Sequence, residues 1–226
     1  MSLEWRELAA APETHPRVLE LLHKHLQPFQ GAKVLDMPCG SGLFSKWMQE
    51  QGLKVTPMDI EDVRPFHHDP AQRVLGDANR GLPFPDGQFD AVVTVEGIEH
   101  LENPSFFLRE CARVVRPGGH VVLTTPNVDA IKSRRHVYLK GYFRYFEPKG
   151  AGLKDAHHLH PIDMIFMRGA IQRAGLAIVE ITVNQFSGKT WFTELTRRYF
   201  THKLPAEMKG EVPYYGDVVI YVLTKP

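Results

Sequence analysis

Residues 34–42 read Val-Leu-Asp-Met-Pro-Cys-Gly-Ser-Gly, and this stretch decides the fold. An apolar pair is followed by Asp36 and then by a tight turn that carries Gly40 and Gly42. A helical pattern begins at once, at Leu43. The segment therefore predicts a strand, a glycine-rich turn and a helix N-terminus in succession. Because glycine lets the backbone approach a ligand closely and a helix start presents unpaired N–H groups, we expect the turn to hold a nucleotide-like cofactor.

The composition is that of an ordinary soluble globular chain. Of 226 residues, 43% are hydrophobic and 23% are charged. The 27 basic and 26 acidic side chains balance, so no global field attracts DNA, and the same balance counts against an RNA partner. The length suits one domain, which we expect to span residues 1–226.

Cysteine usage and hydropathy favour a cytoplasmic location. Two cysteines, Cys39 and Cys111, are too few for a disulfide framework and fit a reducing compartment. The N-terminus lacks the apolar core of a signal peptide, and no apolar run approaches the roughly 20 residues of a transmembrane helix. Oligomeric state cannot be read from the sequence.

Short apolar runs alternate with helical patterns along the chain, which is typical of a parallel sheet covered by helices on both faces. The expected strands are 33–36, 54–58, 73–75, 89–95, 120–125, 176–183 and 217–224, and the expected helices are 15–29, 42–51, 104–115 and 163–174. Arg116-Pro117-Gly118-Gly119 predicts a turn. Residues 1–30 form an N-terminal helical segment in this interpretation, and the irregular stretches 128–160 and 184–215 are insertions that form a lid over an acceptor.

Acidic residues follow four successive predicted strands. Asp36, Asp59, Asp77 and Glu96 each stand where a strand ends. One such acid is usually a helix cap or a turn residue, but four in a row favour a ligand at the carboxyl edge of the sheet. Asp59 comes 17 residues after Gly42, a position from which a carboxylate can accept hydrogen bonds from both hydroxyls of a ribose.

Five ordered motifs make the chain resemble a class I S-adenosylmethionine-dependent methyltransferase, close to methyltransferase type 11 and the ubiquinone-pathway O-methyltransferases. The resemblance extends from Val34 to the last strand. Its motifs are residues 34–42, Gly76-Asp77-Ala78, Leu82-Pro83-Phe84, Phe89-Asp90-Ala91-Val92-Val93 and the segment from Arg113 to Gly119. It implies a Rossmann-like, doubly wound sheet of seven strands that is mostly parallel, with the last strand antiparallel.

The resemblance also implies a cofactor site for S-adenosylmethionine. Asp59 would hold the ribose, Asp77 and Ala78 the adenine, and the segment from Asp36 to Gly42 the methionyl part. The full set is Asp36, Met37, Pro38, Gly40, Gly42, Asp59, Ile60, Asp77, Ala78 and Glu96.

Pro38 departs from the family pattern, because it stands where the first glycine of Asp-x-Gly-x-Gly-x-Gly belongs. Proline has φ near −65° and no N–H, so we expect this position to need neither a positive φ nor a donor. A non-catalytic protein that binds S-adenosylmethionine is one alternative, and Pro38 is its only hint. An NAD-type oxidoreductase is another, but its Gly-x-Gly-x-x-Gly is absent, since position 45 is not glycine.

Glu96-Gly97-Ile98-Glu99-His100 follows the fourth expected strand and supplies the candidate catalytic residues, Glu99 and His100. In one interpretation His100 is simply a loop or helix-end residue. In the other, Glu96, Glu99 and His100 resemble the metal-binding Glu-x-x-Glu-His of small-RNA 2′-O-methyltransferases and ubiquinone-pathway O-methyltransferases.

Those families add a histidine before the helix that precedes the sixth strand. Here that place holds His157, His158 and His160, of which His158 has the best spacing, with His157 or His160 as alternatives. A mixed oxygen and nitrogen shell accepts Mg²⁺, Mn²⁺ or Zn²⁺. In the structural interpretation these are surface loop histidines, three of 12 in the chain.

The expected reaction is in-line O-methylation of a small molecule or a glycan, with or without a metal. Thr124-Thr125-Pro126-Asn127 resembles glycan-modifying methyltransferases, and an RNA 2′-O-methyltransferase-like enzyme is the alternative acceptor class. The lid segment allows two interpretations. Its basic and aromatic side chains either contact the acceptor or pack the lid against the sheet; they are Arg134, Arg135, Tyr138 and Tyr142. Trp191, Leu195 and Tyr199 form one stripe of a helix over 190–200, which leaves core packing, pocket lining, a dimer surface and a membrane contact open.

Overall fold

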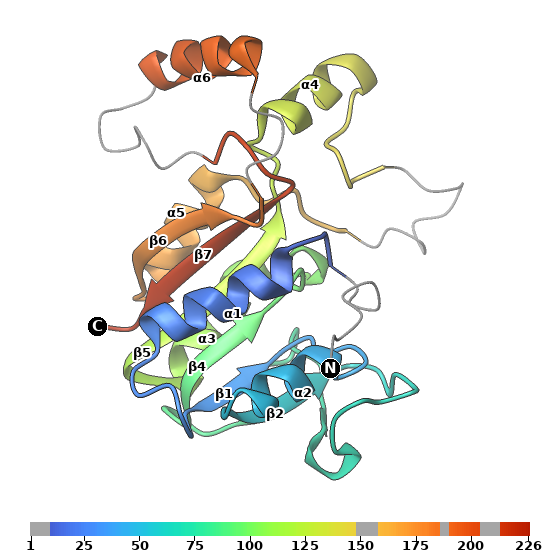
Figure 1. The fold of residues 1–226 in the computed structure, drawn as a ribbon, viewed down its shortest axis with the longest axis vertical. Helices are drawn as coiled ribbons and strands as arrows, with labels where there is room; N and C mark the ends of the chain where they lie inside the picture. Colours follow the sequence, from blue (N-terminus) through green and yellow to red (C-terminus); the bar gives the residue numbers. More distant parts are fainter. Residues whose placement is uncertain (1–9, 148–157, 186–189, 204–212) are drawn as a thin grey trace.

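The computed structural model describes residues 10–147, 158–185, 190–203 and 213–226. Seven strands form one sheet in the order β3-β2-β1-β4-β5-β7-β6 (Figure 1). The strands are β1 (Lys33–Asp36), β2 (Lys54–Asp59), β3 (Val74–Leu75), β4 (Phe89–Thr94), β5 (Val115–Pro126), β6 (Ala177–Val183) and β7 (Val218–Thr224). Only β7 runs against its neighbours β5 and β6 among the paired strands described, which confirms the predicted Rossmann-like topology.

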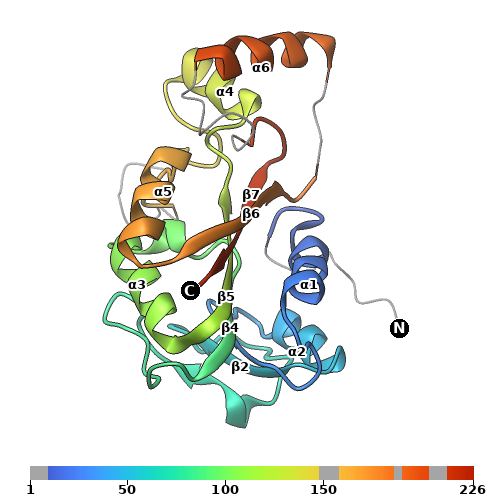
Figure 2. The ribbon, with the colours of Figure 1, turned by 90° about the vertical axis from the view of Figure 1, so that its left-hand side faces the viewer.

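Helices cover both faces of the sheet. Figure 2 shows α1 (Thr14–His25) and α2 (Leu43–Glu50) on one side and α3 (Pro104–Val114) and α5 (Met164–Arg173) on the other. Each side has its own buried apolar cluster, one around Val18, Phe44 and Met48 and one around Phe107 and Met167. The central strand β4 contributes to both clusters because its side chains alternate between the faces.

Helices α3 and α5 both begin at side chains that cap a helix N-terminus, and both caps can be recognised in the sequence. The Asn103 side chain accepts a hydrogen bond from the Phe106 amide at 2.9 Å, and Pro104 occupies the first turn of α3. Asp163 caps α5 in the same way, accepting from the Phe166 amide at 2.7 Å. These caps explain why the predicted boundaries of both helices agree with the structure to within a residue.

Two predicted boundaries are wrong. The first helix ends at His25 rather than Phe29. The predicted Arg116–Gly119 turn lies inside β5, where the pairing register shifts. Residues 116–119 are held within β5 by two hydrogen bonds to the C-terminal segment. The Gly118 amide donates to the Lys225 carbonyl at 2.8 Å, and the Lys225 amide donates to the Gly119 carbonyl at 3.0 Å. That long-range ladder has no local sequence signal.

The stretches predicted as irregular contain two helices, α4 (Ile131–Lys140) and α6 (Trp191–Lys203). The sequence predicted a helix over residues 190–200, which α6 confirms, but it did not predict α4. They lie together beyond the carboxyl end of β5, at the top of Figures 1 and 2, and we call them the cap. Two short 3₁₀ turns complete the described elements, η2 (Pro70–Gln72) and η3 (Ile98–His100). Within the described part of the chain, no helix combines the length and the apolar character that crossing a membrane requires.

Candidate active site

A cavity of about 430 Å³ opens at the carboxyl ends of β1 and β4, the edge at which open parallel sheets bind ligands. Its walls come from the glycine turn, the end of β4, the start of α2 and the N-terminal part of the chain. The lining residues are Ala10, His15, Asp36, Pro38, Cys39, Gly40, Ser41, Leu43, Phe44, Val63, Val95, Glu96 and His100.

The two glycines of the turn serve different purposes. Gly40 has φ +51°, and a Cβ built there meets nothing within 4 Å, so the backbone faces open space in the cavity. Gly42 has φ +74° and lies under the Phe66 ring, where a Cβ would come within 2.5 Å of a ring carbon. Gly40 therefore leaves room for a ligand, whereas Gly42 lets the loop after β2 close against the turn.

Asp59 at the end of β2 braces this turn. Its Oδ2 accepts from the Gly40 amide at 2.8 Å, and its Oδ1 accepts from the Glu61 amide at 3.2 Å. Each carboxylate oxygen has a further lone pair, so hydroxyl donors of a ligand can still bind there. Asp77 and Ala78 follow the next strand, β3, along the same edge. The Asp77 side chain accepts a hydrogen bond from the Asn79 amide at 2.9 Å, and Ala78 is buried. Ile60, the other residue predicted to contact the cofactor here, is 63% exposed.

Pro38 packs against Gly97, which follows the neighbouring strand β4 at the same edge of the sheet. The peptide bond before Pro38 is cis, and the flanking amides of Met37 and Cys39 donate to the carbonyls of Val93 and Met58. A Cβ on Gly97 would lie 2.3 Å from Pro38 Cδ. The proline ring thus fills the space above Gly97, and Met37 points away into the apolar core.

One buried and one half-buried carboxyl group, those of Asp36 and Glu96, line the cavity. Burial raises the pKa of Asp36 to about 7, partly offset by the Ser45 hydroxyl, which donates to Oδ2 at 2.5 Å. Burial likewise raises the pKa of Glu96 to about 7, against a hydrogen bond from the Ala11 amide. Glu96 also has φ +47°, an uncommon conformation for a residue other than glycine. An acidic, glycine-walled cavity fits a cationic cofactor such as a sulfonium compound, whose charge favours ionised carboxylates.

His15 is a cavity residue that the sequence interpretation missed. It lies in the first turn of α1, is 8% exposed, and meets Phe44 edge-on with the ring centroids 4.6 Å apart. Burial lowers its pKa to about 4, so the imidazole is neutral at pH 7. A signal existed, because His15 continues the apolar face of Val18, Leu19 and Leu22 at helical spacing.

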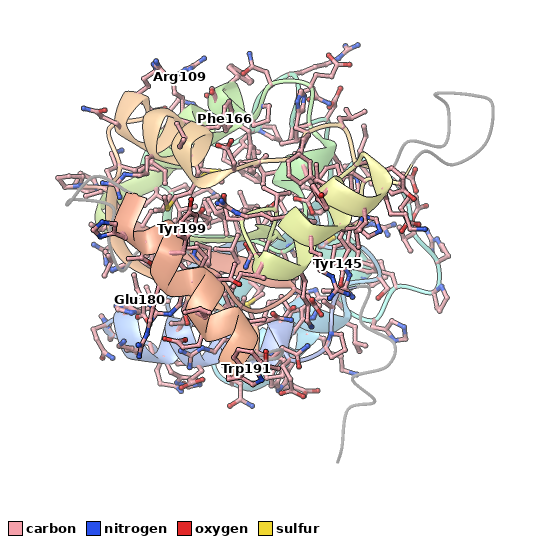
Figure 3. All side chains as sticks on the ribbon, turned by 90° about the horizontal axis from the view of Figure 1, so that it is seen from above. Arg109, Tyr145, Phe166, Glu180, Trp191 and Tyr199 are labelled. Atoms are coloured by element: carbon pink, nitrogen blue, oxygen red, sulfur yellow. The ribbon has the colours of Figure 1, made fainter. Side chains whose placement is uncertain are left out.

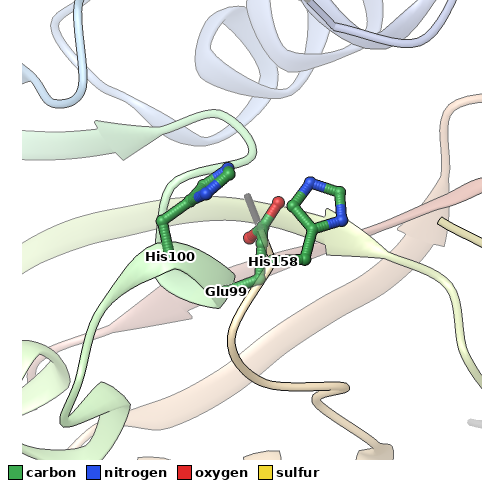
Figure 4. A group of neighbouring side chains, drawn as sticks. All are labelled: Glu99, His100 and His158. Carbon is green, nitrogen blue, oxygen red and sulfur yellow. The ribbon is translucent and has the colours of Figure 1, made fainter. Parts of the chain in front are cut away.

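Three of the four predicted metal ligands come together beside the cavity. Ligand atoms of Glu99, His100 and His158 all lie within 4.8 Å of one another (Figure 4). Glu99 has no exposed surface, and neither of its carboxylate oxygens has a hydrogen-bond partner among the described residues. Burial raises the pKa of Glu99 to about 8. Glu96 is not part of this cluster.

The backbone holds His158 over Glu99. The amides of Leu159 and His160 both donate to the Glu99 carbonyl, at 2.8 and 3.2 Å. His158 Nδ1 lies 2.7 Å from the Tyr145 carbonyl, which can only accept, so Nδ1 carries a hydrogen, and in the neutral ring Nε2 then has the free lone pair. This is the arrangement by which metal-binding histidines are usually oriented. His160 does not join the cluster, and His157 lies outside the described residues.

The fold is that of a doubly wound α/β protein, and its cavity lies at the carboxyl edge of the sheet, where proteins of this fold bind their ligands. The sequence profile of the family described as "Methyltransferase domain" matches residues 5–181. The chain therefore belongs to the methyltransferase domain family.

Relatives found by sequence include ubiquinone biosynthesis O-methyltransferases. The protein from Xanthomonas axonopodis pv. citri is 30% identical over 176 residues, 74% of this chain and 72% of that protein. The protein from Acinetobacter baylyi is 28% identical over 181 residues, 75% of this chain and 74% of that protein. Other matches are shorter: the Caulobacter sp. protein is 35% identical over 108 residues, so the matched part of the chain spans 43% of its length.

Solved structures share the fold at low sequence identity. A SAM-dependent methyltransferase from Archaeoglobus fulgidus superposes with a TM-score of 0.62 at 20% identity, covering 94% of this chain and 95% of that one. A structure described as a methyltransferase from Bacillus halodurans has the same TM-score at 18% identity, covering 94% and 99%.

Proposed function

We propose that this protein transfers the methyl group of S-adenosylmethionine to a hydroxyl oxygen of a small molecule or a glycan. Membership of the methyltransferase domain family supports the reaction class, and the names of the relatives favour oxygen as the acceptor atom. The same membership favours a methyl donor over the nicotinamide cofactor considered from the sequence.

The cofactor site in this proposal follows the edge of the sheet. Asp59 accepts hydrogen bonds from the ribose hydroxyls, Asp77 and Ala78 meet the adenine, and the Asp36–Gly42 turn meets the methionyl part. When bound, the cofactor supplies an electrophilic methyl group on a sulfonium. Gly40 leaves space for it, and the carboxyl groups of Asp36 and Glu96 favour its positive charge.

The single observation that carries a metal-assisted mechanism is the Glu99 carboxylate, which is buried beside two imidazoles with neither oxygen hydrogen-bonded among the described residues. Such a carboxylate is costly to leave without a partner. We propose that Glu99, His100 and His158 hold a divalent cation, whose chemistry is to lower the pKa of an acceptor hydroxyl. Glu99 and His100 thereby act next to the acceptor, and the Tyr145 carbonyl keeps His158 in its coordinating tautomer.

The cofactor and the metal are tested in separate experiments. Isothermal calorimetry with S-adenosylmethionine tests the cofactor site, and Asp59→Asn should weaken binding by tenfold or more, by order of magnitude, because an amide donor replaces one acceptor oxygen. If S-adenosylmethionine does not bind at all, the methyltransferase proposal is wrong.

Transfer to catechol-type hydroxyl compounds and to glycans then tests the acceptor and the metal. We expect EDTA to suppress transfer, Mg²⁺, Mn²⁺ or Zn²⁺ to restore it, and Glu99→Gln to abolish the metal response. Glu102→Gln is the matched control, since Glu102 is exposed on the following segment. Methyl transfer that is unchanged by both EDTA and Glu99→Gln contradicts the metal-assisted mechanism. Catalysis would then come from the alignment of the acceptor with the methyl donor alone.

A further inference from the structure

The chain enters α1 through a tight turn beside the cofactor cavity. Residues 11–14 read Ala-Pro-Glu-Thr, and the amide of the fourth residue donates to the carbonyl of the first at 3.2 Å. Proline at the second position, with φ +64° and ψ 0° at Glu13 in the third, defines a type II turn. On the two sides of this turn, Ala10 and His15 line the cavity. The turn therefore places one wall of the cavity.

The conformation of this turn does not suit its sequence. The third residue of a type II turn has a positive φ, and glycine or asparagine normally occupies it. Glu13 is neither, and its side chain is exposed and caps no helix amide. In a type I turn the central peptide is flipped, and Glu13 would have an ordinary negative φ. The type II form thus needs a contact that holds the central peptide.

Asn184 supplies that contact. The central peptide carries the Pro12 carbonyl, and Asn184 Nδ2 donates to this carbonyl at 2.9 Å. Asn184 directly follows β6 and is 5% exposed. Its Oδ1 accepts from the amides of Asp217 and Val218, at 3.2 and 3.1 Å. The side chain is thereby fixed to the start of β7, with its amide donor directed at the turn.

We propose that Asn184 is a positioning residue for the cofactor cavity. By holding the Pro12 carbonyl it keeps the turn in the type II form, and the turn keeps Ala10 and His15 in place as a wall beside the cofactor. Without this donor, Glu13 relaxes to a negative φ, the central peptide flips and the wall is displaced. The inference rests on the proposed cofactor site and adds to it a residue 172 positions away along the chain from Pro12.

Calorimetry with S-adenosylmethionine at pH 8 tests the role of Asn184. In Asn184→Asp a carboxylate oxygen still accepts from the amides of β7, but no donor faces the Pro12 carbonyl. We expect the dissociation constant to rise about tenfold or more. Adding Glu13→Gly should restore most of the affinity, because glycine adopts a positive φ without the help of Asn184. A merely structural role of Asn184 would not be rescued by a change in the turn.

Glu13→Val tests the turn while Asn184 stays intact. A β-branched residue opposes a positive φ more strongly than glutamate does. The position is exposed, so the substitution leaves the apolar core unchanged. We expect affinity for S-adenosylmethionine to fall about fivefold or more, because the turn again favours the flipped peptide.

A second readout does not need the cofactor. Cys39 lines the same cavity and is 7% exposed, whereas Cys111 has no exposed surface. Mass spectrometry follows the alkylation of Cys39 by N-ethylmaleimide in the ligand-free chain. Asn184→Asp and Glu13→Val should each raise the rate about tenfold, since local opening governs access to a buried group. Glu13→Gly should return the rate of the Asn184→Asp chain toward that of the parent.

Glu180→Gln is the matched control. Glu180 Oε2 accepts from Lys24 Nζ at 2.7 Å and lies 2.8 Å from His25 Nε2, so this side chain of β6 ties down the opposite end of α1 (Figure 3). The control loosens the same helix on the same strand, away from the turn. It should keep the affinity of the parent for S-adenosylmethionine and the parent rate of Cys39 alkylation.

Three results overturn the proposal. In the first, Asn184→Asp has the parent's affinity and the parent's Cys39 rate. In the second, Glu13→Gly rescues neither quantity. In the third, Glu180→Gln changes both as much as Asn184→Asp does, which would mean that any loosening of α1 opens the cavity. If the parent itself does not bind S-adenosylmethionine, the proposed function is wrong, and the Cys39 rates still decide the role of Asn184.

Discussion

Just after β1, Pro38 replaces a family glycine, and the space that it needs comes from Gly97, which follows the neighbouring strand β4. A methyl group on Gly97 would meet Pro38 Cδ at 2.3 Å and Thr94 Oγ1 at 2.9 Å. We predict that Gly97→Ala destabilises the fold by about 2–3 kcal/mol, by overpacking, and weakens cofactor binding because Pro38 lines the cavity.

Denaturant unfolding and calorimetry check this prediction. Gly169→Ala is the matched control: Gly169 lies in α5 and a Cβ there meets only the end of the Arg173 side chain, at 3.2 Å. That change should be neutral or should stabilise by up to about 1 kcal/mol, because alanine is the better helix former. Equal stability of the Gly97→Ala protein and the parent would refute the close contact.

Asp36 makes stability depend on pH. Its pKa is raised in the folded chain from 3.8 to about 7, so its stabilising contribution is complete below pH about 4 and is lost as the pH rises through 7. We predict that Asp36→Asn gains stability over the parent by about 2–4 kcal/mol at pH 8 and by little at pH 4. The asparagine oxygen can still accept from Ser45.

Urea unfolding of the ligand-free protein across this pH range measures the difference. Glu50→Gln, at an exposed carboxyl on α2, is the control and should track the parent. If the difference in unfolding free energy between the parent and the Asp36→Asn variant stays constant from pH 4 to pH 8, the pKa of Asp36 is not raised and the prediction is wrong.

At the scale of elements, α1 reaches the cavity through His15. We predict that His15→Leu lowers kcat/KM for methyl transfer by about tenfold or more, because the substitution removes a neutral hydrogen-bonding side chain from the wall of the cavity. The melting temperature should stay the same or rise, since the ring nitrogens make no hydrogen bond within the described part of the chain. His23→Leu on the same helix, where the ring stacks on Phe29, is the control and should keep full activity.

Arg113 on α3 joins two motifs that are separate in the sequence. Its guanidinium donates to the carbonyls of Leu82 and Phe84 and pairs with Glu110, which in turn accepts from the Leu82 amide. The segment just after Ala78 is thereby tied to α3. We predict that Arg113→Lys costs about 1–3 kcal/mol of unfolding free energy, because a single ammonium cannot replace the planar fork, whereas Arg109→Lys at the helix surface is neutral. Chemical denaturation of both variants decides this, and equal stability would argue against the bracing role.

At the scale of the whole molecule, cofactor binding should stabilise the chain, because the site exists only in the folded sheet. A ligand at 100 times its dissociation constant adds about 2.7 kcal/mol, equivalent to several degrees in melting temperature for a chain of this length. S-adenosylmethionine or its demethylated product should produce this shift in a thermal melt, and Asp59→Asn should reduce it. A melt that is insensitive to both compounds would count against the cofactor site.

Most of the fold could be predicted from local pattern. Caps such as Asn103 and Asp163, the glycine turn and the buried apolar runs each specify their own element through short-range physics. The sequence did not predict helix α4, because its pattern is basic and only weakly amphipathic. It predicted a separate turn at residues 116–119, which belong to β5 because Gly118 and Gly119 form hydrogen bonds with Lys225. Those interactions join residues that are far apart in the chain.

By itself the sequence determined the class of fold, the glycine turn and the row of acids along one edge, because strand ends and turns depend on neighbouring residues. It also predicted that Glu99, His100 and His158 belong together. Only the tertiary structure decided that His15 enters the cavity, that Gly97 accommodates Pro38 and that Trp191, Leu195 and Tyr199 of α6 are exposed. Burial and contact across the sheet depend on how distant segments pack, and no local pattern encodes that packing. The turn at residues 34–42 could thus be recognised in the sequence, but its surroundings had to be seen in three dimensions.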